Sequence, residues 1–90
     1  MKLSKEEVVL AYMSLTQTEE GKPMVFPIAT LMDASHIAIQ LKDKCSENNI
    51  LKDGEVEFST NQKALLLRLI ERPWGALDGT VYFSLKNKLL

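Results

Sequence analysis

A chain of 90 residues is long enough for one domain with a modest core, and we expect residues 1–90 to form a single globular domain. The composition is 46% hydrophobic and 26% charged with a formal net charge of −1, which excludes an intrinsically disordered chain. No run approaches the ~18 apolar residues of a membrane span. The near-balanced charge gives no overall attraction to phosphate.

Cys45 is the single cysteine of the sequence, so an internal disulfide is excluded and a reducing compartment is favoured. Residues 1–7 contain no apolar segment of the kind that a secretory signal requires, and we expect a cytoplasmic protein. Only two of the eleven basic residues are arginine, the residue that best contacts guanine at two points. Nucleic acid is therefore a less favoured partner. The small size, the excess of lysine over arginine and the lack of a targeting segment are typical of a small bacterial or phage protein.

A first helix is predicted from about residue 5 to residue 17. Ser4 and Glu7 have the S-x-x-E spacing of a capping box, in which each side chain accepts a hydrogen bond from the other residue's backbone. Apolar residues then recur at the i, i+4, i+7 spacing of one helix face: Val8, Tyr12 and Leu15. A polar loop is predicted next, at 16–23.

The run at 24–26 favours β structure but lies between two prolines, which allow at most an edge strand. Pro27 then suits the start of a second helix, predicted to reach about residue 47, with Asp33 or Ser35 able to divide it in two. Its apolar residues form a seam that should face another helix: Leu31, Ala34, Ala38, Leu41 and Cys45. Ile28, Met32 and Ile39 make a second apolar stripe, and Asn48 and Asn49 fit the C-terminus of the helix.

The clearest helix is predicted at 60–72. Ser59 and Gln62 form a second capping box, and Pro73 cannot continue the hydrogen-bond ladder. At about 100° per residue, its apolar side chains cover an arc of roughly 200°. These side chains are Leu65, Leu66, Leu67, Leu69 and Ile70. We expect the other elements to pack around this helix.

The pattern D-G-x-V-x-F-S occurs at 53–59 and again at 78–84. In the first copy, strict alternation predicts a strand that turns Val56 and Phe58 inward. The second copy also alternates, but Val81, Leu85 and Leu89 fit one face of a helix that Asp78 could cap, and we favour a turn followed by a helix. If both copies were strands, 54–85 would form a strand–helix–strand unit with a right-handed crossover.

The predicted fold is thus an α-rich α+β domain: three to four helices, with one or two short β-strands or a hairpin, packed around the helix at 60–72.

No catalytic site, metal site or cofactor is predicted. A structural zinc site needs four Cys or His ligands, and the sequence has one of each. Nine residues of one helix separate His36 from Cys45 and place them on opposite faces, so we expect a solvated histidine and a buried thiol. Glu55 and Glu57 would lie about 7 Å apart on a strand, a distance that acid–base carboxylates can use, but the solvent face of the strand is the favoured interpretation.

A recognition surface is the remaining possibility. Arg68 and Arg72 lead into Trp74, and Trp and Arg are enriched at binding hot spots. The alternative is that Trp74 folds back over the core. If the last segment is helical, Phe83 and Leu90 lie behind its apolar stripe and are exposed.

We therefore predict a non-enzymatic protein–protein interaction module, such as a small adaptor, regulator or inhibitor. It would bind another protein or a second copy of itself as a homodimer. The predicted partner-binding residues are Arg68, Arg72, Trp74 and Phe83.

The alternative function is a winged-helix-like DNA-binding transcriptional regulator, because the helix at 27–47 is followed by a turn at Asp53 and Gly54 and then a strand. The reading helix would offer His36, Gln40, Lys42 and Lys44 to a groove. Acidic residues accompany them and disfavour DNA: Asp33, Asp43 and Glu47.

Overall fold

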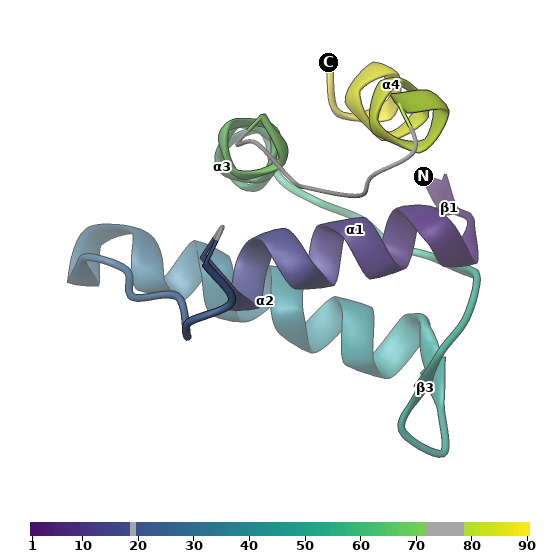
Figure 1. The fold of residues 1–90 in the computed structure, drawn as a ribbon, viewed down its shortest axis with the longest axis horizontal. Helices are drawn as coiled ribbons and strands as arrows, with labels where there is room; N and C mark the ends of the chain where they lie inside the picture. Colours follow the sequence, from purple (N-terminus) through teal and green to yellow (C-terminus); the bar gives the residue numbers. More distant parts are fainter. Residues whose placement is uncertain (19, 72–78) are drawn as a thin grey trace.

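Four helices and two short antiparallel strand pairs make up the part of the chain that the computed structural model describes, residues 1–18, 20–71 and 79–90 (Figure 1). Their order is β1 (Lys2–Leu3), α1 (Lys5–Thr16), α2 (Ile28–Lys44), β2 (Ser46–Glu47), β3 (Ile50–Leu51), β4 (Gly54–Glu55), α3 (Thr60–Ile70) and α4 (Gly79–Leu89). The predicted α+β class is confirmed.

Both predicted capping boxes are present. The Glu7 backbone N–H donates to Ser4 Oγ at 3.3 Å, and the Ser4 N–H donates to Glu7 Oε1 at 2.8 Å. Ser59 and Gln62 make the same reciprocal pair at 3.2 and 2.9 Å. These bonds satisfy backbone donors at the first turns of α1 and α3, which is why both helices begin where the sequence predicts.

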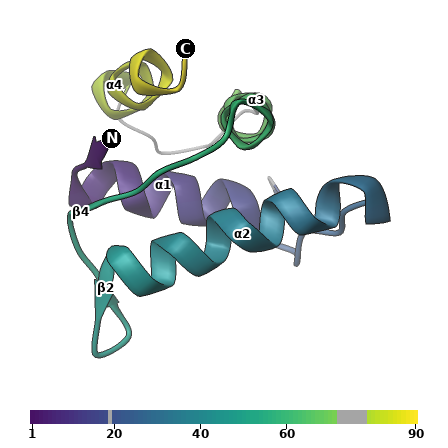
Figure 2. The ribbon, with the colours of Figure 1, turned by 180° about the vertical axis from the view of Figure 1, so that it is seen from behind.

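The helices form two crossed pairs. In Figures 1 and 2, α1 and α2 run across the view, whereas α3 and α4 are seen end-on. α1 and α3 each contact all three other helices. The helix predicted at 60–72 is thus one of two central helices, and α1 is the other.

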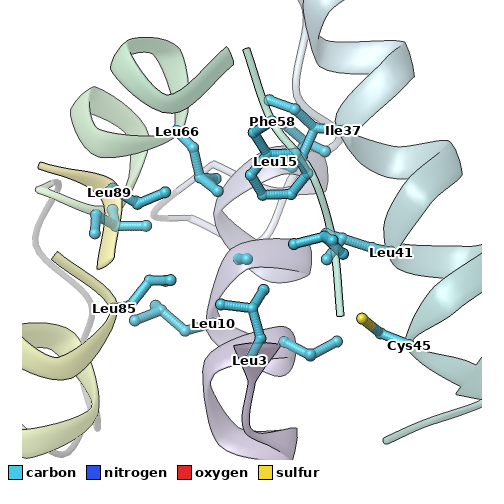
Figure 3. Packing of buried hydrophobic residues seen from close by; sticks show 14 of the residues in the cluster. Leu3, Leu10, Leu15, Ile37, Leu41, Cys45, Phe58, Leu66, Leu85 and Leu89 are labelled. Carbon is cyan, nitrogen blue, oxygen red and sulfur yellow. The ribbon is translucent and has the colours of Figure 1, made fainter. Parts of the chain in front are cut away.

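The core lies where these pairs cross. Leu10 of α1 points toward Leu85 of α4, and Phe58 lies beside Leu15 and Ile37 (Figure 3). All five are at most 6% exposed. Since α1 carries two of them, it joins the α3–α4 side of the core to the α2 side.

The segment after β4 is extended and alternates as predicted, with Val56 and Phe58 buried and Glu57 exposed. Its strand pairing is shorter than predicted, because β4 pairs with β1 at Gly54 and Glu55. Val56 adds one more step, since its N–H donates to the Met1 carbonyl at 2.9 Å and its carbonyl accepts from the N-terminal ammonium of Met1 at 2.7 Å. The Gln40 side chain completes the pairing from α2: its Oε1 accepts from the Glu57 N–H at 2.8 Å, and its Nε2 donates to the Glu57 carbonyl at 2.5 Å.

Strands β2 and β3 form a hairpin that sequence analysis missed. Its turn residues, Asn48 and Asn49, have φ angles of 52° and 64°. Positive φ at both central positions is typical of a type I′ turn, which asparagine adopts readily. The assignment of these residues to the end of a helix was wrong: α2 ends at Lys44. The edge strand considered at 24–26 does not form either.

The two copies of D-G-x-V-x-F-S adopt different structures. The first is extended, whereas the described part of the second lies in α4. The helix that we favoured is confirmed, and the strand–helix–strand unit is wrong. Leu85 and Leu89 are buried as predicted, and Phe83 and Leu90 are 61% and 76% exposed. A shared heptapeptide pattern is too short to fix secondary structure, because the packing partners of its apolar residues decide.

α2 is continuous through Asp33 and Ser35. Its predicted seam is buried at Ala34, Leu41 and Cys45 but not at Leu31, which is 47% exposed. The missing member of the buried face is Ile37, which is fully buried and belongs to neither predicted stripe.

Candidate interaction surface

The residues that could have formed a nucleophilic pair lie apart. Cys45 is fully buried at the end of α2, whereas His36 is exposed. Burial raises the pKa of the Cys45 thiol, and the nearby Asp53 carboxylate raises it further against the opposing effect of Lys52. A thiol held in its protonated form is a poor nucleophile.

The described surface has shallow open pockets with volumes of about 450, 490 and 470 Å³. The first lies beside the extended segment, where Glu55 and Glu57 are both exposed as predicted. Gln40 also lines this pocket, but its amide is held by the Glu57 backbone. Within residues 1–18, 20–71 and 79–90, no three Cys, His, Asp or Glu side chains come together as a metal ion would need.

Of the predicted partner-binding residues, the structure describes Arg68 and Phe83. Arg68 is exposed on α3, and Phe83 is exposed on α4, where its ring packs edge-on against Tyr82 at 5.2 Å between centroids. Arg72 and Trp74 lie outside the described residues, and so does the choice between a core and a surface position for Trp74.

A larger apolar surface lies on α2. Of the eight large hydrophobic side chains that are exposed in the described structure, five belong to this helix and the residues just before it. We call this group the outer face of α2. Its members are between 47% and 88% exposed: Val25, Ile28, Leu31, Met32 and Ile39.

The outer face lies on the side of α2 away from the core. At 100° per residue, Ile28, Met32 and Ile39 fall within about 40° of one another, and the buried residues Ile37 and Leu41 lie roughly 140–180° away from Met32. α2 is therefore apolar on two opposite sides, and its own chain covers one of them. Its first turns also project beyond the end of α1 (Figures 1 and 2).

Few charges interrupt the outer face. Ser35 and His36 lie near its middle, and Lys42 and Asp43 lie at its C-terminal end. The other end is the N-terminus of α2, where Pro27 occupies the cap position without a side-chain cap and the first turn has no acidic residue. The positive end of this helix dipole thus has no anionic neighbour from its own first turn.

A partly buried charge cluster, in which Glu7 is buried and Lys88 is not, ties α1 to α4. Glu7 Oε1 accepts from Lys88 Nζ at 2.6 Å, and Glu7 Oε2 accepts from Ser84 Oγ at 2.6 Å. Lys88 Nζ also donates to the Lys2 carbonyl at 2.8 Å. Burial alone raises the pKa of the Glu7 carboxyl, but the bonds from Lys88, Ser4 and Ser84 together outweigh it and hold this pKa below its usual range. Because both carboxylate oxygens of Glu7 have hydrogen-bond partners, we infer that this cluster stabilises the packing of α4 against α1.

The sequence pattern placed Ile28, Met32 and Ile39 in a second apolar stripe and Leu31 in the seam, but these residues were not identified as a surface. The sequence feature that could have identified this surface is the second apolar stripe on the helix. A helix that packs against its own domain on one side needs a single apolar stripe. Val25 was missed, because its segment was considered only as a strand.

None of the helices in the described ranges is long and apolar enough to cross a membrane. Comparison of the chain with protein-family models, curated proteins and solved structures found no significant match.

Proposed function

We propose that this protein is a non-enzymatic protein–protein interaction module and that it binds its partner through the outer face of α2. The observation that supports this proposal is the gathering of five exposed large hydrophobic side chains on α2 and the residues just before it. Single exposed apolar residues are ordinary on a protein surface, whereas a contiguous group of them is typical of an interaction site.

The energetics support the same interpretation. Fully burying a side chain such as Ile, Leu or Met stabilises by about 1.5–3 kcal/mol relative to leaving it in water. Ile28 and Met32 are 88% and 67% exposed, so most of this stabilisation is still available to a partner. The α2 helix does not need these residues to fold, because Ile37, Leu41 and Cys45 already anchor it to the core.

Among the described residues, Phe83 and Arg68 lie on different helices, and the residue just after the C-terminal end of α4 adds one further exposed large apolar side chain, Leu90. A role in partner binding stays a prediction for Arg68, Arg72, Trp74 and Phe83. The outer face of α2 is the stronger candidate, because four of its five members lie on one helix.

The first test is a comparison of two matched charge substitutions. Affinity capture from the native host is performed with the wild type, with Met32→Glu and with Phe83→Glu, and each captured protein is quantified by mass spectrometry. Both substitutions replace an exposed apolar side chain, so far-UV circular dichroism should show the wild-type helix content for both. We expect one captured partner whose amount falls at least tenfold with Met32→Glu and stays at the wild-type level with Phe83→Glu. The reason is that a carboxylate in a desolvated interface is unfavourable.

The candidate partner is then purified and titrated against the same three proteins by calorimetry, so that direct binding is measured. The opposite pattern, with binding lost in Phe83→Glu and retained in Met32→Glu, would place the working surface on α4.

DNA binding is the second candidate function, because the hairpin β2–β3 follows α2 directly and brings Lys52 to the same end of the molecule as Lys42 and Lys44. Gln40 is not free to read a base, since its amide is bonded to the Glu57 backbone. Lys52 itself forms an ion pair with Glu47 at 3.4 Å.

Chromatography on heparin tests this alternative. Proteins that bind through several phosphate contacts are retained at ~0.15 M salt and released steeply as salt rises. With a net charge of −1, we expect this protein to flow through. Retention that is lost in a Lys42→Ala, Lys44→Ala double variant would favour the DNA-binding function instead.

A further inference from the structure

We infer that the outer face of α2 binds a second copy of this chain, with the two α2 helices packed antiparallel about a two-fold axis between Ser35 and His36. This inference rests on the proposed function, since it names the partner of the same surface. Three features of α2 carry it: the positions of its apolar residues, the distribution of its charges, and its length.

Two apolar residues of the outer face, Met32 and Ile39, are complementary to each other in this arrangement. Pairing about a point between Ser35 and His36 places residue i opposite residue 71 − i of the second copy. Met32 of each chain then faces Ile39 of the other, and the two-fold axis produces this contact twice. Ser35 lies at the crossing point, where a small side chain allows the two helices to approach closely. Closed, isologous contacts of this kind are the commonest form of homo-oligomer.

The charges favour the antiparallel orientation over a parallel one. Pairing in register would set Lys42 against Lys42 and align the two helix dipoles. Antiparallel pairing separates the lysines and brings Asp43 of one copy to the first turn of α2 in the other, beside Ile28. That turn has no acidic residue and no side-chain cap of its own. A carboxylate near the positive end of a helix dipole is favourable.

The length of α2 sets the expected strength. With 17 residues, the helix is about 25 Å long, and a single crossing of two such helices is at the small end of specific interfaces. We therefore expect a reversible dimer that dissociates on dilution through the micromolar range.

Sedimentation equilibrium of the full chain between ~2 and ~500 µM tests the self-association. We expect the weight-average mass to rise with concentration from the 10.2 kDa of the monomer toward twice that value. Met32→Glu and Ile39→Glu should each raise the dissociation constant at least tenfold. Ile50→Glu, at an exposed apolar residue of the hairpin, should leave it within twofold of the wild type. Two variants are used because either one alone could alter the helix, which circular dichroism checks.

Disulfide cross-linking tests the orientation. In the antiparallel dimer the two copies of residue 35 lie beside the axis, so Ser35→Cys should form a dimer under mild oxidation. The two copies of residue 28 would be about 22 Å apart along the helices, far beyond the Cα separation that a disulfide allows, so Ile28→Cys should stay monomeric. The wild type is the control, because its Cys45 is fully buried. A parallel dimer would cross-link in both variants and would overturn the antiparallel arrangement.

The outcomes also separate this inference from the proposed function. A purified chain that stays monomeric at ~500 µM, together with capture of a different protein that depends on Met32, overturns self-association and leaves the interaction module standing. A monomeric chain with no Met32-dependent partner overturns both. A dimer that Phe83→Glu dissociates and Met32→Glu does not would move the self-association to α4.

Discussion

Replacing Gly54 with alanine is expected to lower the free energy of unfolding by about 3 kcal/mol, at the upper end of the range for overpacked sites. A Cβ at this position would overlap the Lys44 carbonyl oxygen and would lie 2.7 Å from Cys45 Sγ and 2.9 Å from the Lys44 carbonyl carbon. Neither neighbour can move away easily. The Lys44 carbonyl belongs to the last residue of α2, and the Cys45 side chain is fully buried. β4 can therefore approach the end of α2 only through a residue without a side chain.

Urea denaturation followed by circular dichroism measures this effect, with Gly79→Ala as the matched control. A Cβ on Gly79 meets no atom within 4 Å, and Gly79 is the first residue of α4, so alanine there should leave stability unchanged or raise it by up to about 1 kcal/mol. Equal unfolding midpoints for the two variants would show that the approach of β4 to α2 is not as close as described.

Replacing Glu7 is expected to have the second largest effect. Glu7→Ala removes the acceptor of three hydrogen bonds, from Ser4, Ser84 and Lys88, and leaves the Lys88 ammonium without its buried partner. We expect the free energy of unfolding to fall by about 2–3 kcal/mol. This is less than for a fully buried ion pair, because the Lys88 side chain is 36% exposed and can regain water. Glu7→Gln keeps the acceptor of the capping box, and its free energy of unfolding should be lower than that of the wild type by about 1 kcal/mol.

The same carboxylate makes stability depend on pH. Its pKa is lower in the folded protein than in the unfolded chain, so protons bind the unfolded state more readily. The contribution of Glu7 is therefore complete above the ordinary glutamate pKa of about 4.3 and is lost as the pH falls below it.

Urea midpoints measured from pH 7 to pH 3 should converge between the wild type and Glu7→Gln at the acid end. Glu6→Gln is the control, because Glu6 lies exposed in the same turn and should change little. A constant gap between wild type and Glu7→Gln at every pH would contradict the charge assignment.

The features that sequence predicted best are those set by neighbouring residues. The capping boxes at Ser4 and Ser59 depend on a side chain three residues away, so local spacing is enough to identify them. The inward alternation of Val56 and Phe58 is equally local.

The features that sequence could not predict depend on contacts between distant residues. Glu7 and Lys88 are 81 positions apart, and nothing in their local sequences pairs them. The burial of Ile37 and the exposure of Ile28 are decided by where α1 and α3 lie against α2. Periodicity alone placed Ile28 in an apolar stripe and Ile37 in none. The hairpin turn at Asn48 and Asn49 was missed for another reason: asparagine suits both a helix terminus and a type I′ turn.

The central proposal is that the outer face of α2 is the interaction surface of this protein and that a second copy of the chain binds it. It is tested most directly by comparing amide ¹H–¹⁵N spectra of the full chain at ~20 and ~500 µM, with Met32→Glu as the reference for the undimerised state. We predict concentration-dependent shifts confined to residues 25–43, and their absence in Met32→Glu. Shifts centred on Phe83 and Leu90, with residues 25–43 unchanged, would contradict the proposal.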